Sequence, residues 1–153
     1  MVDYKNILPI KVGDQAPLFS LQNQAGQKIN LQDYKGKKNV LLIFYPGDNT
    51  PGCTTQLCNI RDDFSRFTKL DTVVFGINQA DNNSHQKFID NYKFPFDLLI
   101  DTDSQVSKKY KALKFMFGHV SIKRSVVLID KTGKIVFLKR GMPKDDEILK
   151  ILK

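Results

Sequence analysis

The sequence predicts a layered α/β domain in which helices cover a central β-sheet. Continuous stretches of β-branched and aromatic residues, typical of strands covered on both faces, occur at Asn39–Phe44, Thr72–Ile77 and Ser125–Ile129. Between them lie stretches whose apolar residues recur every three or four positions, as on one face of a helix. A chain of 153 residues has the length of one domain, so we expect residues 1–153 to form a single domain.

An N-terminal hairpin precedes the first of these central strands. Two short stretches of alternating polarity, Leu18–Leu21 and Lys28–Leu31, flank a polar turn that contains Gly26. Such alternation on both sides of a glycine-containing turn is the pattern of two antiparallel strands. We therefore expect Leu18–Asp33 to form a β-hairpin.

Three helices and one short strand are expected between the central strands. We assign the helices to stretches in which apolar residues are spaced by three and four positions. The helices span Cys53–Phe67, Asn82–Tyr92 and Gln105–Leu113, and the short strand is Asp97–Ile100. The right-handed rule for crossover connections then places helices on both faces of the sheet.

The end of the chain predicts a second hairpin and a final helix. Lys131–Lys134 is a tight turn with a glycine, and it leads from the third central strand into a last strand at Ile135–Lys139. Met142-Pro143 opens a short terminal helix, because proline suits the first helical turn. A sheet that ends in a hairpin and a helix is the thioredoxin-like arrangement. We therefore expect a thioredoxin-like fold with a central mixed β-sheet flanked by helices.

Composition narrows the classes of protein to consider. Of the residues, 41% are hydrophobic and 26% are charged, the balance of a globular protein rather than a disordered one. No apolar stretch approaches the roughly 18 residues that a membrane span needs. The first twenty residues contain charges and lack the apolar core of a secretory signal. We therefore expect a cytoplasmic protein with no membrane partner.

The net charge of +8 is concentrated in the last third of the chain. Residues 104–153 hold 13 Lys and Arg against 4 Asp and Glu, whereas residues 1–103 hold 11 against 12. A basic region allows nucleic-acid binding as one interpretation. The lysines are scattered, however, and aromatic residues do not alternate with them as in RNA-binding modules. The favoured interpretation is a solvated basic face, with no specific nucleic-acid partner.

The stretch from Pro46 to Cys58 concentrates the residues that can do chemistry. It follows a buried strand and opens a predicted helix, so it lies at the carboxyl end of the sheet, where open α/β folds bind their ligands. Prolines and glycines shape the loop and leave Cys53 in the first turn of the helix. Free N–H groups and the positive end of the helix dipole favour the thiolate form of a cysteine at such a position.

A thiolate alone does not make a good catalyst. An ordinary thiol is already about 3% ionised at pH 7, so complete ionisation raises reactivity by roughly 30-fold at most. The site must therefore also bind the reacting partner and stabilise developing charge. Thr50 can both donate and accept a hydrogen bond, and Arg124, beside the strand Ser125–Ile129, can supply positive charge.

These residues resemble the active-site pattern of a known family. Pro46-x-x-x-Thr50-x-x-Cys53 is similar to the peroxiredoxin motif, and Tyr45–Cys58 resembles the Q-type subfamily, the bacterioferritin comigratory proteins. Gln56 stands where that subfamily commonly has glutamate. The resemblance extends over nearly the whole chain, through Val12–Phe19, Ser84–Phe88 and Ile122–Ser125.

The resemblance implies a thiol-dependent peroxidase that reduces hydrogen peroxide and organic hydroperoxides in antioxidant defence. In the family pattern Cys53 is the peroxidatic nucleophile, which becomes a sulfenic acid, and Cys58 resolves this into an intramolecular disulfide. Pro46 shields the site from water, while Thr50 and Arg124 hold the peroxide and polarise its O–O bond. Thioredoxin or a glutaredoxin-like dithiol protein then reduces the disulfide. The resemblance implies neither a cofactor nor a metal.

The spacing of the two cysteines adds a conformational prediction. Positions i and i+5 of a regular helix have Cα atoms about 8.6 Å apart, whereas disulfides rarely span more than ~7 Å. If Cys53 and Cys58 are both helical in the reduced protein, the first one or two turns must unwind before the disulfide forms. Because both cysteines belong to one chain, the chemistry needs no second subunit, and we expect a monomer.

Other functions remain as alternatives. A dithiol–disulfide oxidoreductase suits the fold, but it normally has Cys-x-x-Cys, and here four residues intervene. A zinc site from the two cysteines, His85 and His119 lacks short ligand spacing, and we expect each histidine on a helix surface or in a loop. Cys58 also has an alternative as a mere packing residue on its helix. Nucleic-acid binding depends on the basic last third alone.

Overall fold

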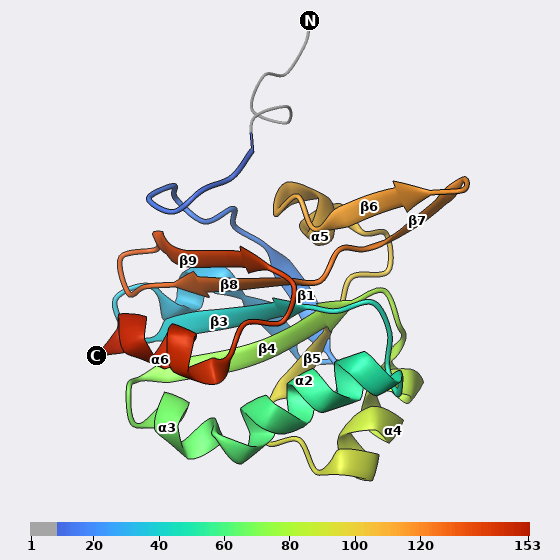
Figure 1. Ribbon diagram of the computed structural model, residues 1–153, viewed down its shortest axis with the longest axis horizontal. Coiled ribbons are helices and arrows are strands. Elements are labelled where there is room, and N and C mark those ends of the chain that lie inside the picture. Colours follow the sequence, from blue (N-terminus) through green and yellow to red (C-terminus); the bar gives the residue numbers. More distant parts are fainter. Residues whose placement is uncertain (1–8) are drawn as a thin grey trace, which may run out of the picture.

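The structure, a computed structural model, describes residues 9–153, and Figure 1 shows it as a ribbon. Its centre is a seven-stranded sheet with the strand order β2-β1-β5-β4-β3-β8-β9. The strands are β1 (Ser20–Asn23), β2 (Lys28–Asn30), β3 (Asn39–Phe44), β4 (Thr72–Asn78), β5 (Asp97–Ile100), β8 (Ser125–Ile129) and β9 (Ile135–Arg140). Residues 1–8, which the single-domain prediction includes, lie outside the described residues.

The sheet is mixed, as predicted. β3, β4 and β5 run parallel to one another, whereas β8 is antiparallel to β3 and pairs with β9 as a hairpin. The N-terminal hairpin of β1 and β2 is also confirmed, and it joins the sheet through antiparallel pairing of β1 with β5. The predicted ranges of β3, β5 and β8 agree with the structure, because a strand buried on both faces is a continuous apolar stretch in the sequence.

Two apolar cores lie on opposite faces of this sheet. One face is covered by α2 (Pro51–Asp62), α3 (Phe64–Thr68), α4 (Asn82–Tyr92) and α6 (Asp145–Leu152). The other is covered by a short 3₁₀ helix (Leu31–Tyr34), α5 (Gln105–Lys109) and the segment that precedes β1. Alternate residues of β3 enter the two cores, with Leu41 and Ile43 on the first face and Leu42 and Phe44 on the second.

The helix predicted at Cys53–Phe67 is interrupted in the structure. Asp63 leaves the helical conformation, with φ −97° and ψ 7°, and separates α2 from α3. Both helices bury apolar residues against the same face of the sheet, so the spacing in the sequence continues across the break and did not reveal it. The last helix also begins later than predicted, at Asp145, after Met142-Pro143.

The helix predicted at Gln105–Leu113 is wrong in its second half. Helix α5 ends at Lys109, and Lys111 has a φ of +55°, a left-handed conformation that no helix continues through. Leu113 instead begins a strand, β6 (Leu113–Met116), which pairs antiparallel with β7 (His119–Ile122). These two strands form a separate hairpin that was not predicted from the sequence.

The turn and exposure of this hairpin explain why it was missed. Phe117 and Gly118 connect the strands, and both have positive φ, 50° and 78°, as a two-residue type I′ turn requires. Phe117 is an unusual residue for such a turn, and its side chain is 95% exposed. Phe115 and its partner Val120 are exposed as well, so apolar residues in the middle of the strands do not mark a buried face, although Ile122 at the end of β7 is buried. Figure 1 shows the hairpin projecting from the body of the molecule.

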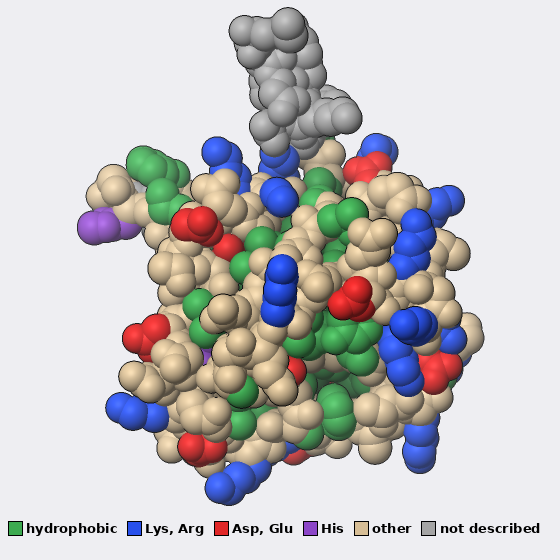
Figure 2. All heavy atoms as spheres, turned by 180° about the vertical axis from the view of Figure 1, so that it is seen from behind, with side chains coloured by type: hydrophobic (Ala, Val, Ile, Leu, Met, Phe, Trp, Pro, Cys, Tyr) green, Lys and Arg blue, Asp and Glu red, His purple; other side chains and the backbone are tan. Residues whose placement is uncertain are grey.

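Basic side chains are dispersed over the face of the molecule that Figure 2 draws. Figure 2 shows Lys and Arg scattered around one face and interspersed with Asp and Glu rather than gathered in one patch. Within residues 9–153, no helix has both the length and the apolar character needed to cross a membrane.

Candidate active site

The candidate site lies at the carboxyl end of β3, where the loop Tyr45–Thr50 leads into α2. Thr50 is the N-cap residue of α2, and Pro51 is the first helical residue, so Cys53 lies in the first turn as predicted. Pro46 and Thr50 are exposed, whereas Cys53 is only 1% exposed. The sulfur of Cys53 is therefore buried beneath an exposed rim.

The sulfur of Cys53 contacts a charged group and an apolar wall. Arg124, from the segment between β7 and β8, donates from Nη2 to Sγ of Cys53 at 3.3 Å. Cys53 also belongs to an apolar cluster of buried residues that includes Tyr45 and Leu57. A positive charge next to an apolar wall attracts a sulfur anion more strongly than the same charge does in water.

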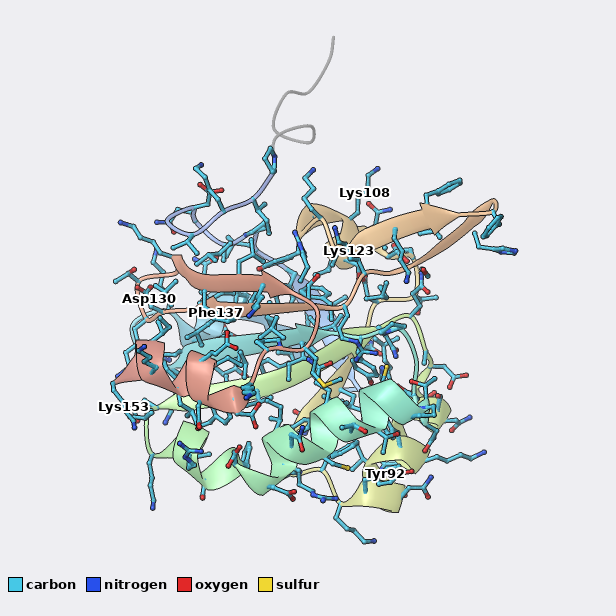
Figure 3. The ribbon with its side chains drawn as sticks, in the orientation of Figure 1. Tyr92, Lys108, Lys123, Asp130, Phe137 and Lys153 are labelled. Carbon is cyan, nitrogen blue, oxygen red and sulfur yellow. The ribbon has the colours of Figure 1, made fainter. Side chains whose placement is uncertain are left out.

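Arg124 itself is held in place by several contacts. Its Nη1 donates to Oε1 of Gln56 at 2.7 Å, and its carbonyl oxygen accepts from the N–H of Gly141 at 2.7 Å. Arg140 donates to Oγ of Ser125, the residue directly after Arg124, at 2.7 Å. In Figure 3 the labelled Lys123, directly before Arg124, lies at the base of the β6–β7 hairpin. No function was predicted for Arg140, because nothing nearby in the sequence links it to Cys53.

Two glycines provide space around the site. A Cβ atom on Gly52 would lie 3.2 Å from Nη2 of Arg124, so the absent side chain lets the guanidinium approach the first turn of α2. A Cβ atom on Gly76 would lie 2.9 Å from Cε1 of Tyr45. The absence of a side chain at Gly76 therefore lets the Tyr45 ring lie against the backbone of β4, within the apolar cluster that contains Cys53.

Thr50 and the start of α2 offer hydrogen bonds to a ligand. The Thr50 hydroxyl donates to the carbonyl oxygen of Gly47 at 3.0 Å and makes no capping bond to the helix. Its oxygen therefore keeps lone pairs that can accept a hydrogen bond. The N–H groups in the first turn of α2 have no partner inside the helix and can donate to an oxygen atom.

Cys58 lies in the same helix as Cys53, and both thiols are free. Cys58 is half-buried and packs against the apolar cluster that contains Cys53. The condition of the conformational prediction is therefore met, since both cysteines are helical in this form of the protein. The unwinding that it requires stays a prediction.

The loop Tyr45–Thr50 is also hydrogen-bonded to β4 and α4 through the side chain of Asp48. The carboxylate of Asp48 accepts hydrogen bonds from Tyr45, Asn78, Ser84 and His85. His85 is completely buried, so the expectation that it lies on a helix surface or in a loop is wrong. Ser84 and His85 stand in a stretch that resembles the family, but nothing in the sequence indicated that they contact Asp48.

The structure does not assemble the alternative zinc site. His119 is exposed on the projecting hairpin, and both ring nitrogens of His85 are engaged in hydrogen bonds. In residues 9–153, no group of three or more His, Cys, Asp or Glu side chains is arranged to hold a metal ion.

Known proteins resemble this chain in sequence along most of its length. Residues 12–138 match the AhpC/TSA family. Peroxiredoxin Bcp of Bacillus subtilis is 36% identical over 149 residues, which cover 95% of this chain and 94% of that protein. A putative peroxiredoxin bcp of Coxiella burnetii is 42% identical over 132 residues, covering 84% and 87% of the two chains. Peroxiredoxin Q, chloroplastic, of Suaeda salsa is 37% identical over 155 residues, covering 97% and 72%.

Solved structures of related proteins have a similar fold. The crystal structure of peroxidoxin BcpB from Mycobacterium tuberculosis superposes with a TM-score of 0.86 at 27% identity, covering 94% of this chain and 96% of that one. The crystal structure of a cysteine-to-serine mutant of PrxQ from Xylella fastidiosa gives a TM-score of 0.85 at 28% identity, covering 94% and 95%. These likenesses confirm the predicted thioredoxin-like fold.

Proposed function

This chain belongs to the AhpC/TSA family and is a thiol-dependent peroxidase of the peroxiredoxin type, and we propose that Cys53 is the sulfur that attacks the peroxide. One observation carries the proposal. Sγ of Cys53 lies in the first turn of α2 and accepts a hydrogen bond from the Arg124 guanidinium at 3.3 Å. A peroxidatic cysteine needs this combination, because the helix start and the guanidinium both favour the thiolate.

In the first step the Cys53 thiolate attacks one oxygen of the hydroperoxide. An S–O bond forms while the O–O bond breaks, and its electron pair leaves with the second oxygen as hydroxide or alkoxide. That oxygen takes up a proton to give water or an alcohol, and Cys53 is left as a sulfenic acid. Thr50 accepts the hydrogen bond of the hydroperoxide O–H, and Arg124 and the free N–H groups of α2 stabilise the negative oxygen. Pro46 shields the site from water.

In the second step Cys58 is the resolving cysteine. Its thiolate attacks the sulfur of the Cys53 sulfenic acid, an S–S bond forms, and the hydroxide that leaves is protonated to water. The start of α2 must unwind for this step, because two helical positions five apart hold their Cα atoms about 8.6 Å from each other.

The remaining proposals concern the surroundings of the enzyme. A dithiol protein, thioredoxin or a glutaredoxin-like protein, reduces the disulfide and restores both thiols. This requirement supports the cytoplasm as the compartment, because dithiol proteins keep it reducing. We also propose that residues 1–153 form one domain that acts as a monomer, since both cysteines belong to one helix. Sedimentation of the reduced and oxidised protein tests the oligomeric state.

Peroxide consumption with a thioredoxin system tests this function. The wild-type protein should consume peroxide, and Cys53→Ser should be inactive because the nucleophile is absent. Cys58→Ser should form a sulfenic acid that dimedone traps, but it should not turn over with thioredoxin. A wild-type protein that leaves peroxide unchanged contradicts the proposal, and a Cys58→Ser variant with full turnover contradicts the role of Cys58.

A further inference from the structure

Asp48 is a buried carboxylate at the centre of the active-site loop. Its side chain is 3% exposed. Oδ1 accepts from the Tyr45 hydroxyl at 2.7 Å and from Nδ2 of Asn78 at 3.1 Å. Oδ2 accepts from the Ser84 hydroxyl at 2.7 Å and lies 2.7 Å from Nδ1 of His85. One side chain of the loop thus binds to β4 and α4 together.

Both ring nitrogens of His85 lie against oxygen atoms. Nε2 lies 2.9 Å from the carbonyl oxygen of Leu99, which can only accept, so Nε2 carries a hydrogen. Burial raises the pKa of Asp48, but hydrogen bonds from His85, Tyr45 and Ser84 outweigh it and hold that pKa below its usual value. Nδ1 of His85 faces this carboxylate at 2.7 Å, so each ring nitrogen lies against an oxygen atom, one of the Asp48 side chain and one of the Leu99 backbone.

The pair lies directly beneath the groups that are proposed to bind peroxide. Asp48 stands between Pro46 and Thr50 in the loop, and it follows Gly47, whose carbonyl accepts the Thr50 hydroxyl. Tyr45, which donates to Asp48, packs in the same apolar cluster as Cys53. Displacement of Asp48 would therefore move the rim of the site and the wall beside the sulfur.

Stability alone does not account for such a pair. Burial of a carboxylate such as that of Asp48 costs free energy of desolvation, and apolar residues of the same volume often stabilise a protein as well. The contribution of these residues is the placement of the loop. Each carboxylate oxygen of Asp48 is hydrogen-bonded by two groups, so the loop is restricted to one position.

We propose that Asp48 and His85 are positioning residues of the peroxidase reaction, which hold the loop Tyr45–Thr50 in its peroxide-binding form while the start of α2 unwinds and refolds. The inference depends on the proposed role of Cys53. It goes beyond that role, because neither residue touches the reacting atoms.

Two substitutions of His85 separate its two hydrogen bonds. In His85→Asn the amide nitrogen stands near the place of Nδ1 and can still donate to Asp48. In His85→Gln the amide reaches toward the place of Nε2 and can donate to the Leu99 carbonyl, but Asp48 loses its donor. The two variants are thus matched controls for each other.

The measurement compares two reactions of Cys53 in single turnovers. Reaction with hydrogen peroxide needs the hydrogen-bonding groups that the positioned loop supplies, whereas alkylation by iodoacetamide needs none of them, although it too must reach the buried sulfur of Cys53. For His85→Gln we expect the peroxide rate constant to fall by about 10- to 100-fold, the effect of a misplaced catalytic site. Its alkylation rate should change much less. For His85→Asn the peroxide rate should recover to within about fivefold of wild type.

Three results would overturn the inference. These are wild-type peroxide rates in both variants, equal losses in the two reactions, and a rate in His85→Asn no better than in His85→Gln. If the His85 variants do not fold, Ser84→Ala removes one donor to Asp48 and should lower the peroxide rate relative to alkylation by about threefold. An unchanged ratio in Ser84→Ala also contradicts the inference. Failure of the proposed function is distinguishable, because wild-type Cys53 would then not react with peroxide at all.

Discussion

The two halves of the active site are attached to the fold in different ways. The loop that contains Asp48 is bonded to β4 and α4 through buried side chains. In the first turns of α2 the side-chain hydrogen bonds of the threonines are local, from Thr50 to Gly47 and from Thr55 to Pro51. The more distant ties there come from Arg124, which bonds to Cys53 and Gln56.

This difference matches the two demands of the reaction. Binding of peroxide needs a fixed frame, whereas disulfide formation needs a helix that can partly unwind. Near its carboxyl end, α2 is also bonded to another element, because Arg61 donates to the carbonyl oxygen of Tyr92 at 2.6 Å. Figure 3 labels Tyr92 on α4. We therefore expect the first turns of α2 to unwind between these two anchored segments, so that Cys53 reaches Cys58 without disturbing the sheet.

Loss of the Arg124 charge, which contacts Cys53 and Gln56 in α2, should have the largest effect on the peroxide rate constant. For Arg124→Gln we expect the peroxide rate constant to fall by about 100- to 1000-fold, as when one donor to a developing oxyanion is lost. Stopped-flow oxidation measures it. Arg66→Gln is the matched control, because Arg66 pairs with Asp63 and Asp146, and its rate should equal wild type. A rate in Arg124→Gln close to that of wild type would remove Arg124 from the mechanism.

Oxidation should affect the first turns of α2 and the helix α4 differently. In the disulfide form the amides of residues 51–58 should lose most of their protection against hydrogen exchange, because the first turns of α2 have unwound. Amides of α4 should keep theirs, since the bonds to Asp48 remain. Exchange measured by mass spectrometry on both redox forms, with circular dichroism, checks this. Identical helical content in the two forms would contradict it.

Gly52→Ala should impair the reaction without weakening the fold. The new Cβ would lie 3.2 Å from Nη2 of Arg124, so the guanidinium must move away from the first turn of α2. We expect the peroxide rate to fall by about 10-fold. Alanine is the better helix former by up to about 1 kcal/mol, so the free energy of unfolding in urea should not decrease. An unchanged rate would contradict this, because it would show that the Arg124 guanidinium accommodates the added methyl group without losing its function.

The smallest expected effect lies at the far end of α2. Burial, followed by the hydrogen bond with Asp63, raises the pKa of Asp145 to about 7. Because this folded-state pKa is above the ordinary 3.8, its contribution to stability is complete below pH 3.8 and is lost as the pH rises through 7. Asp145→Asn should therefore stabilise the protein against urea more at about pH 8 than at about pH 5. Its peroxide rate should match wild type, and an equal gain at both pH values would contradict the assignment.

Prediction from the sequence succeeded where the signal was local. The strand Asn39–Phe44 and the position of Cys53 in the first helical turn depend on residues a few positions apart. The β6–β7 hairpin was not predicted, because the apolar residues Phe115 and Val120 in its strands are exposed and Phe117 is an unusual residue for its turn. The break at Asp63 was not predicted either, because α2 and α3 bury the same face.

The chain by itself determined a central apolar sheet and a cysteine at the start of a helix, since burial on both faces of a strand and the chemistry of a helix end depend on neighbouring residues. The tertiary structure alone decided which distant groups meet there. Arg124 lies 71 positions from Cys53, and His85 lies 37 positions from Asp48. Hydrogen bonds act over about 3 Å, so only the packing of β4, α4 and β8 around the loop makes these contacts possible.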